Sequence, residues 1–326
     1  MSRRALITGI NGQDGSYLAE LLLERGYEVH GVVRREAIED TAHRLANIRH
    51  LLGRLTLHPA ALDHQLSIYR LVGELRPDEC YHLGAASFVS HAFDDDASVL
   101  ASNFNSTHHL LSSVRELAPS CRFYFAGSSE MFGNADVSPQ TEQTRFNPRS
   151  IYGISKLAGY HLACNYRRQY GLYVCTGILY NHESPRRGFE FVTRKISSTA
   201  AKIHLGLAER LELGDLEARR DWGHSPEYVA AMHAMLSRPS PGDYVIATGK
   251  LHSVRQFLEA AFAVLGRDYR EYVHTNPAYL RRDEGVPLCG DASKAARELG
   301  WQPKKSMREI AEEMVRADLA LFKGAR

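Results

Sequence analysis

The stretch Thr8-Gly9-Ile10-Asn11-Gly12-Gln13-Asp14-Gly15 follows directly on the apolar residues 5–7 and decides the fold of this chain. Apolar residues that run into glycines at positions i, i+3 and i+6 predict a strand, a tight turn and the start of a helix. Such glycines let the backbone approach a pyrophosphate, and the helix N-terminus attracts its negative charge. The sequence therefore predicts a dinucleotide site made by Gly9, Asn11, Gly12, Gln13, Asp14 and Gly15.

Short apolar runs alternate with helical patterns along the first half of the chain. The expected strands are residues 5–8, 28–33, 79–83, 122–126 and 173–178, and the expected helices are 16–25, 67–75, 103–116 and 152–170. This alternation is typical of a parallel sheet with helices on both faces. The predicted fold class is α/β, a Rossmann-type doubly wound parallel sheet with a smaller, partly interleaved C-terminal lobe.

The second half changes character after residue 180. Pro- and Arg-rich turns appear, and we expect helices at 191–205, 253–265 and from 306, with a strand at 244–247. We predict a dinucleotide-binding domain of residues 1–180 plus roughly 214–248. Residues 181–213 and 249–326 form the expected substrate-binding lobe.

Composition and charge exclude several classes of partner. The 326 residues include 40 Lys and Arg against 38 Asp and Glu, a net charge of +2, so neither nucleic acid nor membrane is an expected partner. No apolar run reaches the roughly 20 residues of a membrane helix, and no signal-peptide core is present. The five cysteines lack CxxC spacing. We therefore expect reduced thiols, no bound metal and a cytoplasmic location.

Two arginines follow the second expected strand. An acidic residue at this place bonds the ribose 2′-hydroxyl of NAD, whereas the chain has Arg34 and Arg35. Because guanidinium groups suit a 2′-phosphate, the sequence predicts NADP rather than NAD. Glu36 follows directly and works against phosphate binding, and an exposed basic turn is the alternative interpretation.

Four residues form the candidate catalytic set. Tyr152 and Lys156 are four positions apart and share one face of the expected helix. A nearby ammonium group lowers the pKa of a phenol and makes it a base for a sugar hydroxyl. Ser128 and Glu130 follow an apolar strand and add a hydroxyl donor and a second base, although Glu130 could instead cap a helix or turn. One base supports alcohol oxidation, whereas two bases permit oxidation followed by elimination.

These motifs together resemble the extended short-chain dehydrogenase/reductases, which carry the patterns GxxGxxG and YxxxK. Within that group the chain is similar to the GDP-mannose 4,6-dehydratase family over essentially its whole length. The similarity is strongest at NHESPRRG (181–188), FVTRKI (191–196), GDLEARRDWGH (214–224) and DYVIATG (243–249). The fold expected from the resemblance agrees with the fold expected from the pattern.

The resemblance implies how a GDP-linked sugar and NADP bind. Asn181 and Arg220 fall where the family contacts the diphosphate, and Arg281 and Glu284 fall in a motif that contacts the nucleotide. Leu83, next to the cofactor, and Ser87, next to the sugar, belong to one family stretch. Arg186 and Lys195 are the remaining substrate-binding candidates, because they are positively charged residues in the same segments. Their donors suit a nucleotide diphosphate, and a salt-bridge network is the alternative.

The resemblance also implies a reaction, the 4,6-dehydration of GDP-mannose. Tyr152, aided by Lys156, takes the carbon 4 hydroxyl proton while hydride passes to NADP, and Ser128 polarises the carbon 4 oxygen. Glu130 then removes the carbon 5 proton, water leaves from carbon 6 with Glu130 or Ser128 as proton donor, and the hydride returns to carbon 6. A homodimer through the helix at 152–170 is implied, with a homotetramer as the alternative.

Several positions depart from the family pattern. Ala60 stands where relatives usually bond the adenine through an acidic residue, and Ala86 and Phe88 replace a Gln and a His near the sugar. The altered pocket leaves GDP-manno-heptose as an alternative substrate. The loop after Arg35 also lacks the Ser- and Asn-rich sequence that helps relatives form tetramers. A sugar-nucleotide epimerase or reductase is a further alternative. The intact catalytic set argues against a non-catalytic NADP sensor.

Overall fold

A parallel sheet forms the centre of the computed structural model, which describes residues 2–85, 93–279 and 286–324. Within these residues the sheet has seven strands in the order β10-β6-β5-β4-β1-β2-β3. Their bounds are β1 Arg4–Thr8, β2 Glu28–Val33, β3 Thr56–Pro59, β4 Glu79–His82, β5 Arg122–Ser128, β6 Val174–Leu179 and β10 Asp243–Ile246. The strand order reverses between β1 and β4, and ligands of open α/β sheets bind at such a reversal.

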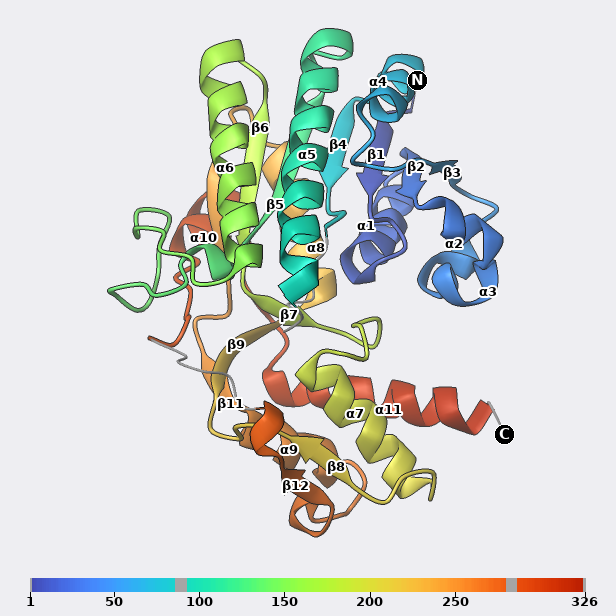
Figure 1. Cartoon of the computed structure of the whole chain (residues 1–326), viewed down its shortest axis with the longest axis vertical. Coiled ribbons are helices and arrows are strands. Elements are labelled where there is room, and N and C mark those ends of the chain that lie inside the picture. Colours follow the sequence, from blue (N-terminus) through green and yellow to red (C-terminus); the bar gives the residue numbers. More distant parts are fainter. Residues whose placement is uncertain (1, 86–92, 280–285, 325–326) are drawn as a thin grey trace.

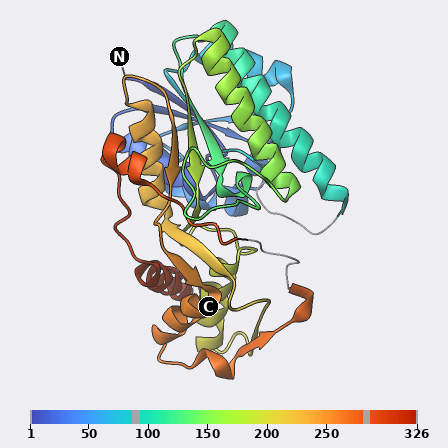
Figure 2. The same cartoon turned by 90° about the vertical axis from the view of Figure 1, so that its left-hand side faces the viewer.

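Helices cover both faces of this sheet (Figure 1, Figure 2). One face carries α4 Gln65–Leu75, α5 Phe93–Leu117 and α6 Ile151–Tyr170, and the other carries α1 Gln13–Glu24, α8 Ser225–Leu236 and α10 Ser293–Leu299. Side chains of β1 alternate between the two cores, because successive residues of a strand point to opposite faces. Leu6 packs under α4 and α5, whereas Ala5 and Ile7 pack under α1 and α8. The short helices α2 Arg35–Glu39 and α3 Thr41–Arg44 follow β2.

A second group of elements lies below the sheet in Figure 1. It contains the sheet β11-β9-β7 and the strand pair β12-β8. The bounds are β7 Asn181–Glu183, β8 Leu211–Leu213, β9 Arg219–His224, β11 Leu251–Ser253, β12 Val273–Thr275, α7 Val192–His204, α9 Val254–Ala263 and α11 Met307–Gly324. Trp222 and Phe257 lie in its own apolar core, between α7, α9 and α11.

The predicted fold class is confirmed, with differences in several elements. The helix expected at 103–116 begins ten residues earlier, at Phe93, and the strand expected at 122–126 continues to Ser128. No helix is predicted where α8 lies. This helix buries Tyr228, Val229, Met232 and Leu236 on most of its sides, so it has no amphipathic stripe to recognise. The division into two domains stays a prediction.

Among the described helices, none combines the length and the apolar character that crossing a membrane requires.

Candidate functional site

The glycine turn closes tightly against the end of β4. Gly9 has a φ of +70°, and a Cβ atom on Gly9 would lie 2.9 Å from the Cα atom of Gly84. A Cβ atom on Gly15 would lie 2.2 Å from the carbonyl oxygen of Gly9. Gly9 and Gly15 therefore have no room for a side chain, and Gly12 stands exposed at the start of α1. Bare backbone in front of a helix N-terminus fits the pyrophosphate of a dinucleotide.

The polar side chains of this turn contact other parts of the chain. Asn11 Nδ2 donates to the carbonyl of Arg44 at 3.0 Å, and Asn47 Nδ2 donates to the carbonyl of Asn11 at 3.1 Å. Asn11 therefore joins the turn to the segment after β2. Of the three glycines, Gly12 is exposed, Gly9 is half-buried and Gly15 is buried, and the assignment of Asn11 as a cofactor ligand stays a prediction.

Gln13 and Asp14 join the glycine turn to β7 and α8. Gln13 Nε2 donates to the carbonyl of His182 at 3.0 Å, and Ser184 Oγ donates to Gln13 Oε1 at 2.8 Å. Asp14 lies 2.7 Å from His182 Nε2 and accepts from Ser225 Oγ at 2.8 Å. These side chains hold the cofactor turn and the predicted substrate segment together. Their assignment as direct cofactor ligands stays a prediction.

The two arginines after β2 are accessible. Arg34 precedes α2 and Arg35 begins it, and both are exposed. Arg35 Nε lies 3.3 Å from Glu39 Oε1, in an ion pair between side chains that are largely exposed. Such a pair is weak, so it leaves the guanidinium available to a phosphate. Leu83, the remaining predicted cofactor contact, follows β4 and is half-buried.

The end of β5 meets the first turn of α6. Ser128 ends β5, and its hydroxyl lies close enough to the phenol of Tyr152 to lower the pKa of that phenol. A Cβ atom on Gly153 would lie 2.5 Å from the carbonyl oxygen of Glu130, so the helix packs directly on the backbone of that residue. Ser150 caps α6 by accepting from the Gly153 amide at 3.0 Å. Folding thus brings Ser128, Glu130 and Tyr152 together.

Lys156 lies one turn further along α6 and is buried. Its Nζ donates to the carbonyl of Ala126 at 2.9 Å and lies 5.8 Å from the ring centroid of Tyr152. Burial lowers the pKa of Lys156 to about 8, although the charge of Asp14 acts in the opposite direction. The ammonium group is therefore fixed beside the phenol, on the face of α6 that the sequence predicts.

The pKa of Tyr152 differs from the expectation. We expect a lowered pKa from Lys156, whereas burial raises the pKa of Tyr152 to about 12 in this structure. The hydrogen bond from Ser128 and the charge of Arg187 lower it, and the charges of Glu130 and Asp14 raise it. The physical reason is that a phenolate loses its hydration when it is buried.

Arg187 is a site residue that sequence reasoning missed. Its charge acts on Tyr152, Asp14 and His182, and its Nε lies 3.3 Å from Glu183 Oε2. The guanidinium also stacks 3.6 Å from the ring centroid of Phe191. The selected neighbour, Arg186, contacts α1 instead. The sequence indicates only that two adjacent side chains, those of Arg186 and Arg187, point in different directions. It does not indicate which of the two lies near Tyr152.

Arg186 is occupied by contacts with α1. Its Nη1 donates to Ser16 Oγ at 3.1 Å, its Nη2 donates to Glu20 Oε1 at 2.6 Å, and its guanidinium lies 3.9 Å from the ring centroid of Tyr17. A partly buried ion pair with a stacked ring has a structural function without any ligand. Substrate binding by Arg186 stays a prediction.

The other predicted substrate residues lie on β7, α7 and β9. Asn181 begins β7 and pairs with Trp222 of β9. Lys195 Nζ lies 4.3 Å from the ring centroid of Tyr279, and burial lowers its pKa while Glu212 raises it. Arg220 lies on β9, where its Nη1 donates to the carbonyl of Arg219 at 2.7 Å. The predicted contacts Ser87, Arg281 and Glu284, and the departures Ala86 and Phe88, lie outside the described residues.

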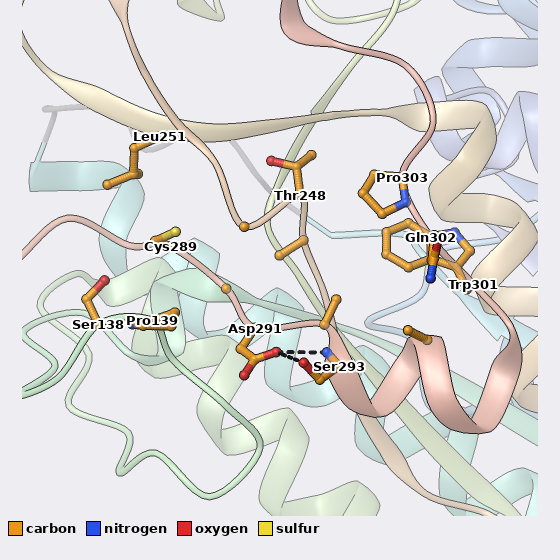
Figure 3. Close-up of a pocket in the computed structure, with 15 residues that line it drawn as sticks. Ser138, Pro139, Thr248, Leu251, Cys289, Asp291, Ser293, Trp301, Gln302 and Pro303 are labelled. Carbon is orange, nitrogen blue, oxygen red and sulfur yellow. Dashed lines mark hydrogen bonds between the residues drawn. The ribbon is translucent and has the colours of Figure 1, made fainter.

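A cavity of about 510 Å³ is lined by residues from the segments 138–139, 247–251, 289–296 and 301–303. Figure 3 draws these residues as sticks. The wall of the cavity includes Thr248, Gly249 and Gly290, whose backbone amides donate to the buried carboxylate of Asp221. Arg220 is not among the described residues that line this cavity. Of the described residues that line it, none belongs to the catalytic set. A second cavity of about 300 Å³ is lined by residues 214–217, 255 and 275–277.

Comparisons with known proteins agree with this arrangement. The sequence model of the family described as GDP-mannose 4,6 dehydratase matches residues 6–314. The GDP-mannose 4,6 dehydratase of Drosophila melanogaster is 44% identical over 98% of this chain and 87% of its own length. The GDP-mannose 4,6 dehydratase of Homo sapiens is 43% identical over 98% of this chain and 92% of its own. The structure of RMD from Pseudomonas aeruginosa complexed with NADPH covers 98% of this chain and 100% of its own, with a TM-score of 0.81 and 22% identity.

Proposed function

The chain belongs to the GDP-mannose 4,6-dehydratase family, and we propose that it removes water from GDP-mannose to give the GDP-linked 4-keto-6-deoxy sugar. One observation carries the proposal. A hydroxyl donor, two proton-transfer groups and an ammonium group meet at the end of β5, and the glycine turn opens at the same edge of the sheet. Two bases at one site are what oxidation followed by elimination requires.

The first proton transfer belongs to Tyr152. The phenol takes the proton of the carbon 4 hydroxyl, and Ser128, which lowers the pKa of that phenol, polarises the carbon 4 oxygen. Burial opposes ionisation of Tyr152, so the phenolate depends on positive charge nearby. Lys156, whose Nζ lies 5.8 Å from the centroid of the Tyr152 ring, and Arg187 supply that charge. When bound, the nicotinamide supplies a hydride acceptor at carbon 4 and a hydride donor at carbon 6, so that the reaction consumes no cofactor.

Elimination belongs to Glu130. Oxidation at carbon 4 makes the carbon 5 proton acidic, and the Glu130 carboxylate removes it. The carbon 6 hydroxyl then leaves as water after it receives a proton from Glu130 or Ser128. When the hydride has returned to carbon 6, carbon 5 takes up the proton that Tyr152 holds, so the product differs from the substrate by one water molecule. Each of these proton transfers is worth about 10²–10⁴-fold in rate.

The proposed cofactor is NADP. The glycine turn has the room and the helix N-terminus for the pyrophosphate. Arg34 and Arg35 are exposed directly after β2, where a ribose 2′-phosphate would meet them. The proposed substrate contacts for the diphosphate are Asn181 of β7, Arg220 of β9 and Lys195 of α7. The alternative with GDP-manno-heptose depends on Ala86 and Phe88 and stays a prediction.

We also propose a homodimer through α5 and α6. Leu100 and Phe104 of α5 and Ile154 of α6 are large apolar side chains that are 37–41% exposed. They lie on the two helices that pack against each other on one face of the sheet. Exposed apolar groups gathered on one face are typical of a surface that another copy covers.

The experiment is an incubation of the protein and NADP with GDP-mannose, followed by mass spectrometry of the sugar nucleotide. We expect a product lighter by one water molecule and no accumulation of NADPH. Tyr152→Phe should abolish this product, while the folded variant still binds the cofactor. An unchanged substrate mass with the wild-type protein would contradict the proposed function. In a parallel incubation that contains NADPH in place of NADP, net consumption of NADPH would instead identify a reductase.

A further inference from the structure

A buried chain of hydrogen bonds joins the glycine turn to the catalytic helix. It begins just after β4, where the Gly84 amide donates to Thr8 Oγ1 at 3.0 Å. Thr8 Oγ1 lies 2.9 Å from His82 Nδ1, and His82 Nε2 lies 3.1 Å from Thr107 Oγ1. His82 therefore bridges β1, which leads into the glycine turn, and α5.

The same chain continues from α5 to α6. Thr107 Oγ1 donates to the carbonyl of Asn103 at 2.8 Å, and the side-chain Nδ2 of Asn103 donates to Ser155 Oγ at 3.0 Å. Ser155 Oγ then donates to the carbonyl of Tyr152 at 2.8 Å. Thr8, His82, Thr107, Asn103 and Ser155 are all buried. The chain thus ends on the backbone of the proposed base.

The direction of each hydrogen bond is determined. The Thr107 hydroxyl proton goes to a carbonyl, which cannot donate, so Thr107 Oγ1 accepts from His82 Nε2–H. The Thr8 hydroxyl accepts from the Gly84 amide and donates to His82 Nδ1. This assignment needs the neutral Nε2–H tautomer of His82. Burial and the charge of Lys156 lower the pKa of His82 to about 3, so the ring is neutral at physiological pH.

The two ends of this series of hydrogen bonds, at Gly84 and at Tyr152, act on the reacting groups through the backbone. Gly84 touches Gly9 of the glycine turn, because a Cβ atom on Gly9 would lie 2.9 Å from the Gly84 Cα atom. Tyr152 lies in the first turn of α6, and the position of its backbone sets the position of its phenol. With each intermediate donor and acceptor used, the turn and the helix cannot shift relative to each other without breaking a buried hydrogen bond, which is costly.

We propose that His82 is a positioning residue that fixes the distance between the glycine turn and Tyr152. The proposal rests on the proposed function, in which the cofactor lies on the turn and Tyr152 is the base. Misplacement of reacting groups by a fraction of an ångström to one ångström slows the chemical step by roughly ten- to hundredfold. His82 therefore sets the rate of hydride transfer from carbon 4 and not the affinity for the sugar nucleotide.

The test removes the hydrogen bond on each side of His82. Thr8→Val and Thr107→Val remove one hydroxyl each with little change in volume, and the double variant removes both. We expect each single variant to lower kcat by about tenfold, with an unchanged KM for GDP-mannose and a larger deuterium isotope effect with substrate labelled at carbon 4. Because either cut breaks the same link, the double variant should lose no more than a single one.

A matched control is available in the same sheet. Thr176 is a fully buried residue of β6 whose hydroxyl has no hydrogen-bond partner among the described residues. Thr176→Val should leave kcat and the isotope effect unchanged. His82→Gln keeps a donor toward Thr107 but loses the acceptor for the Thr8 hydroxyl. It therefore serves as the test, with the same expected loss of kcat, if Thr8→Val does not fold.

Three results would overturn the positioning role of His82. They are single losses that multiply in the double variant, an isotope effect that stays at the wild-type value, or an equal loss in Thr176→Val. A loss of thermal stability with unchanged kcat would show that the chain is only structural. Activity of the wild-type protein distinguishes the two proposals. If the wild-type protein does not dehydrate GDP-mannose, the proposed function is contradicted. If the wild-type protein is active and the losses of the two single variants multiply, only the positioning role of His82 is contradicted.

Discussion

Asp14 Oδ2 lies 2.7 Å from Nε2 of His182, a residue 168 positions further along the chain. The other ring nitrogen, Nδ1, lies 2.7 Å from the carbonyl oxygen of Tyr180. A carboxylate and a carbonyl only accept hydrogen bonds, so both nitrogens of His182 carry protons and the pair is ionic. Burial lowers the pKa of His182, but Asp14 outweighs it and raises the pKa above its ordinary value. Burial likewise raises the pKa of Asp14, and His182 outweighs it and lowers the value.

The first prediction concerns the pH dependence of stability. The raised pKa of His182 stabilises the fold below about pH 6.5, and this stabilisation disappears as the pH rises through the value in the folded state. The lowered pKa of Asp14 stabilises the fold above about pH 4, and this disappears in acid. Asp14→Asn should therefore lower the free energy of unfolding by about 3 kcal/mol at pH 6 and by less at pH 9. Urea unfolding at both values measures this, and an equal loss would refute the ionic pair.

The second prediction separates the two bases. Glu130→Gln keeps the size of the side chain but removes the carboxylate, so oxidation at carbon 4 proceeds and elimination stops. Reduced nicotinamide should accumulate on the protein after addition of GDP-mannose, with dehydration slower by about 10²–10⁴-fold. Stopped-flow fluorescence measures the reduced cofactor. Glu209→Gln, a change at an exposed position, is the control. Near wild-type dehydration by Glu130→Gln would remove Glu130 from the mechanism.

The third prediction concerns Arg187. Burial is the largest influence on Tyr152 and raises its pKa to about 12, while Arg187 lowers that pKa. Arg187→Met should therefore move the acid limb of the kcat–pH profile to higher pH, with a loss of about tenfold at pH 7 and a smaller loss at pH 9. Arg186→Met removes the same charge from the neighbouring position, which contacts α1, and should leave the position of the limb unchanged. If both variants shift the limb equally, the charge acts only over long range.

The fourth prediction concerns the choice of cofactor. Replacing both Arg34 and Arg35 with Ala should weaken NADP binding by about ten- to hundredfold and leave NAD binding nearly unchanged, since only NADP carries the 2′-phosphate. Isothermal titration calorimetry with each cofactor measures the two dissociation constants. Arg210→Ala, an exposed arginine beside β8, controls for the loss of a surface charge. Equal losses for NAD and NADP would show that the two arginines do not read the phosphate.

The fifth prediction concerns assembly. Leu100→Glu together with Phe104→Glu introduces charge into the proposed α5 and α6 surface and should raise the dimer dissociation constant by at least about a hundredfold. Light scattering after size-exclusion chromatography measures the mass in solution. Leu66→Glu together with Tyr69→Glu makes the same change on α4, where both residues are exposed, and should leave the mass unchanged. A wild-type protein that elutes as a monomer would contradict the proposed dimer.

The sequence by itself determined the features that depend on local pattern. The glycine spacing from Gly9 to Gly15 predicts a turn because only a residue without Cβ fits there. In the structure, a Cβ atom added to Gly15 would lie 2.2 Å from the carbonyl oxygen of Gly9. The spacing of Tyr152 and Lys156 predicts a shared helix face, and Lys156 Nζ lies 5.8 Å from the Tyr152 ring centroid. The periodicity of two and of 3.6 residues predicts the strands and helices of the central sheet, and the α/β fold class is confirmed.

Only the tertiary structure decided which groups meet across the chain. It placed Arg187 near Tyr152 and Arg186 against α1, although the two are adjacent in the sequence. It paired Asp14 with His182, and it joined Thr8 to Tyr152 through His82. It also raised the pKa of Tyr152, because burial depends on what packs around the ring. The physical reason is common to all of these. Local pattern fixes the backbone of an element, whereas orientation, burial and long-range partners follow from packing between elements.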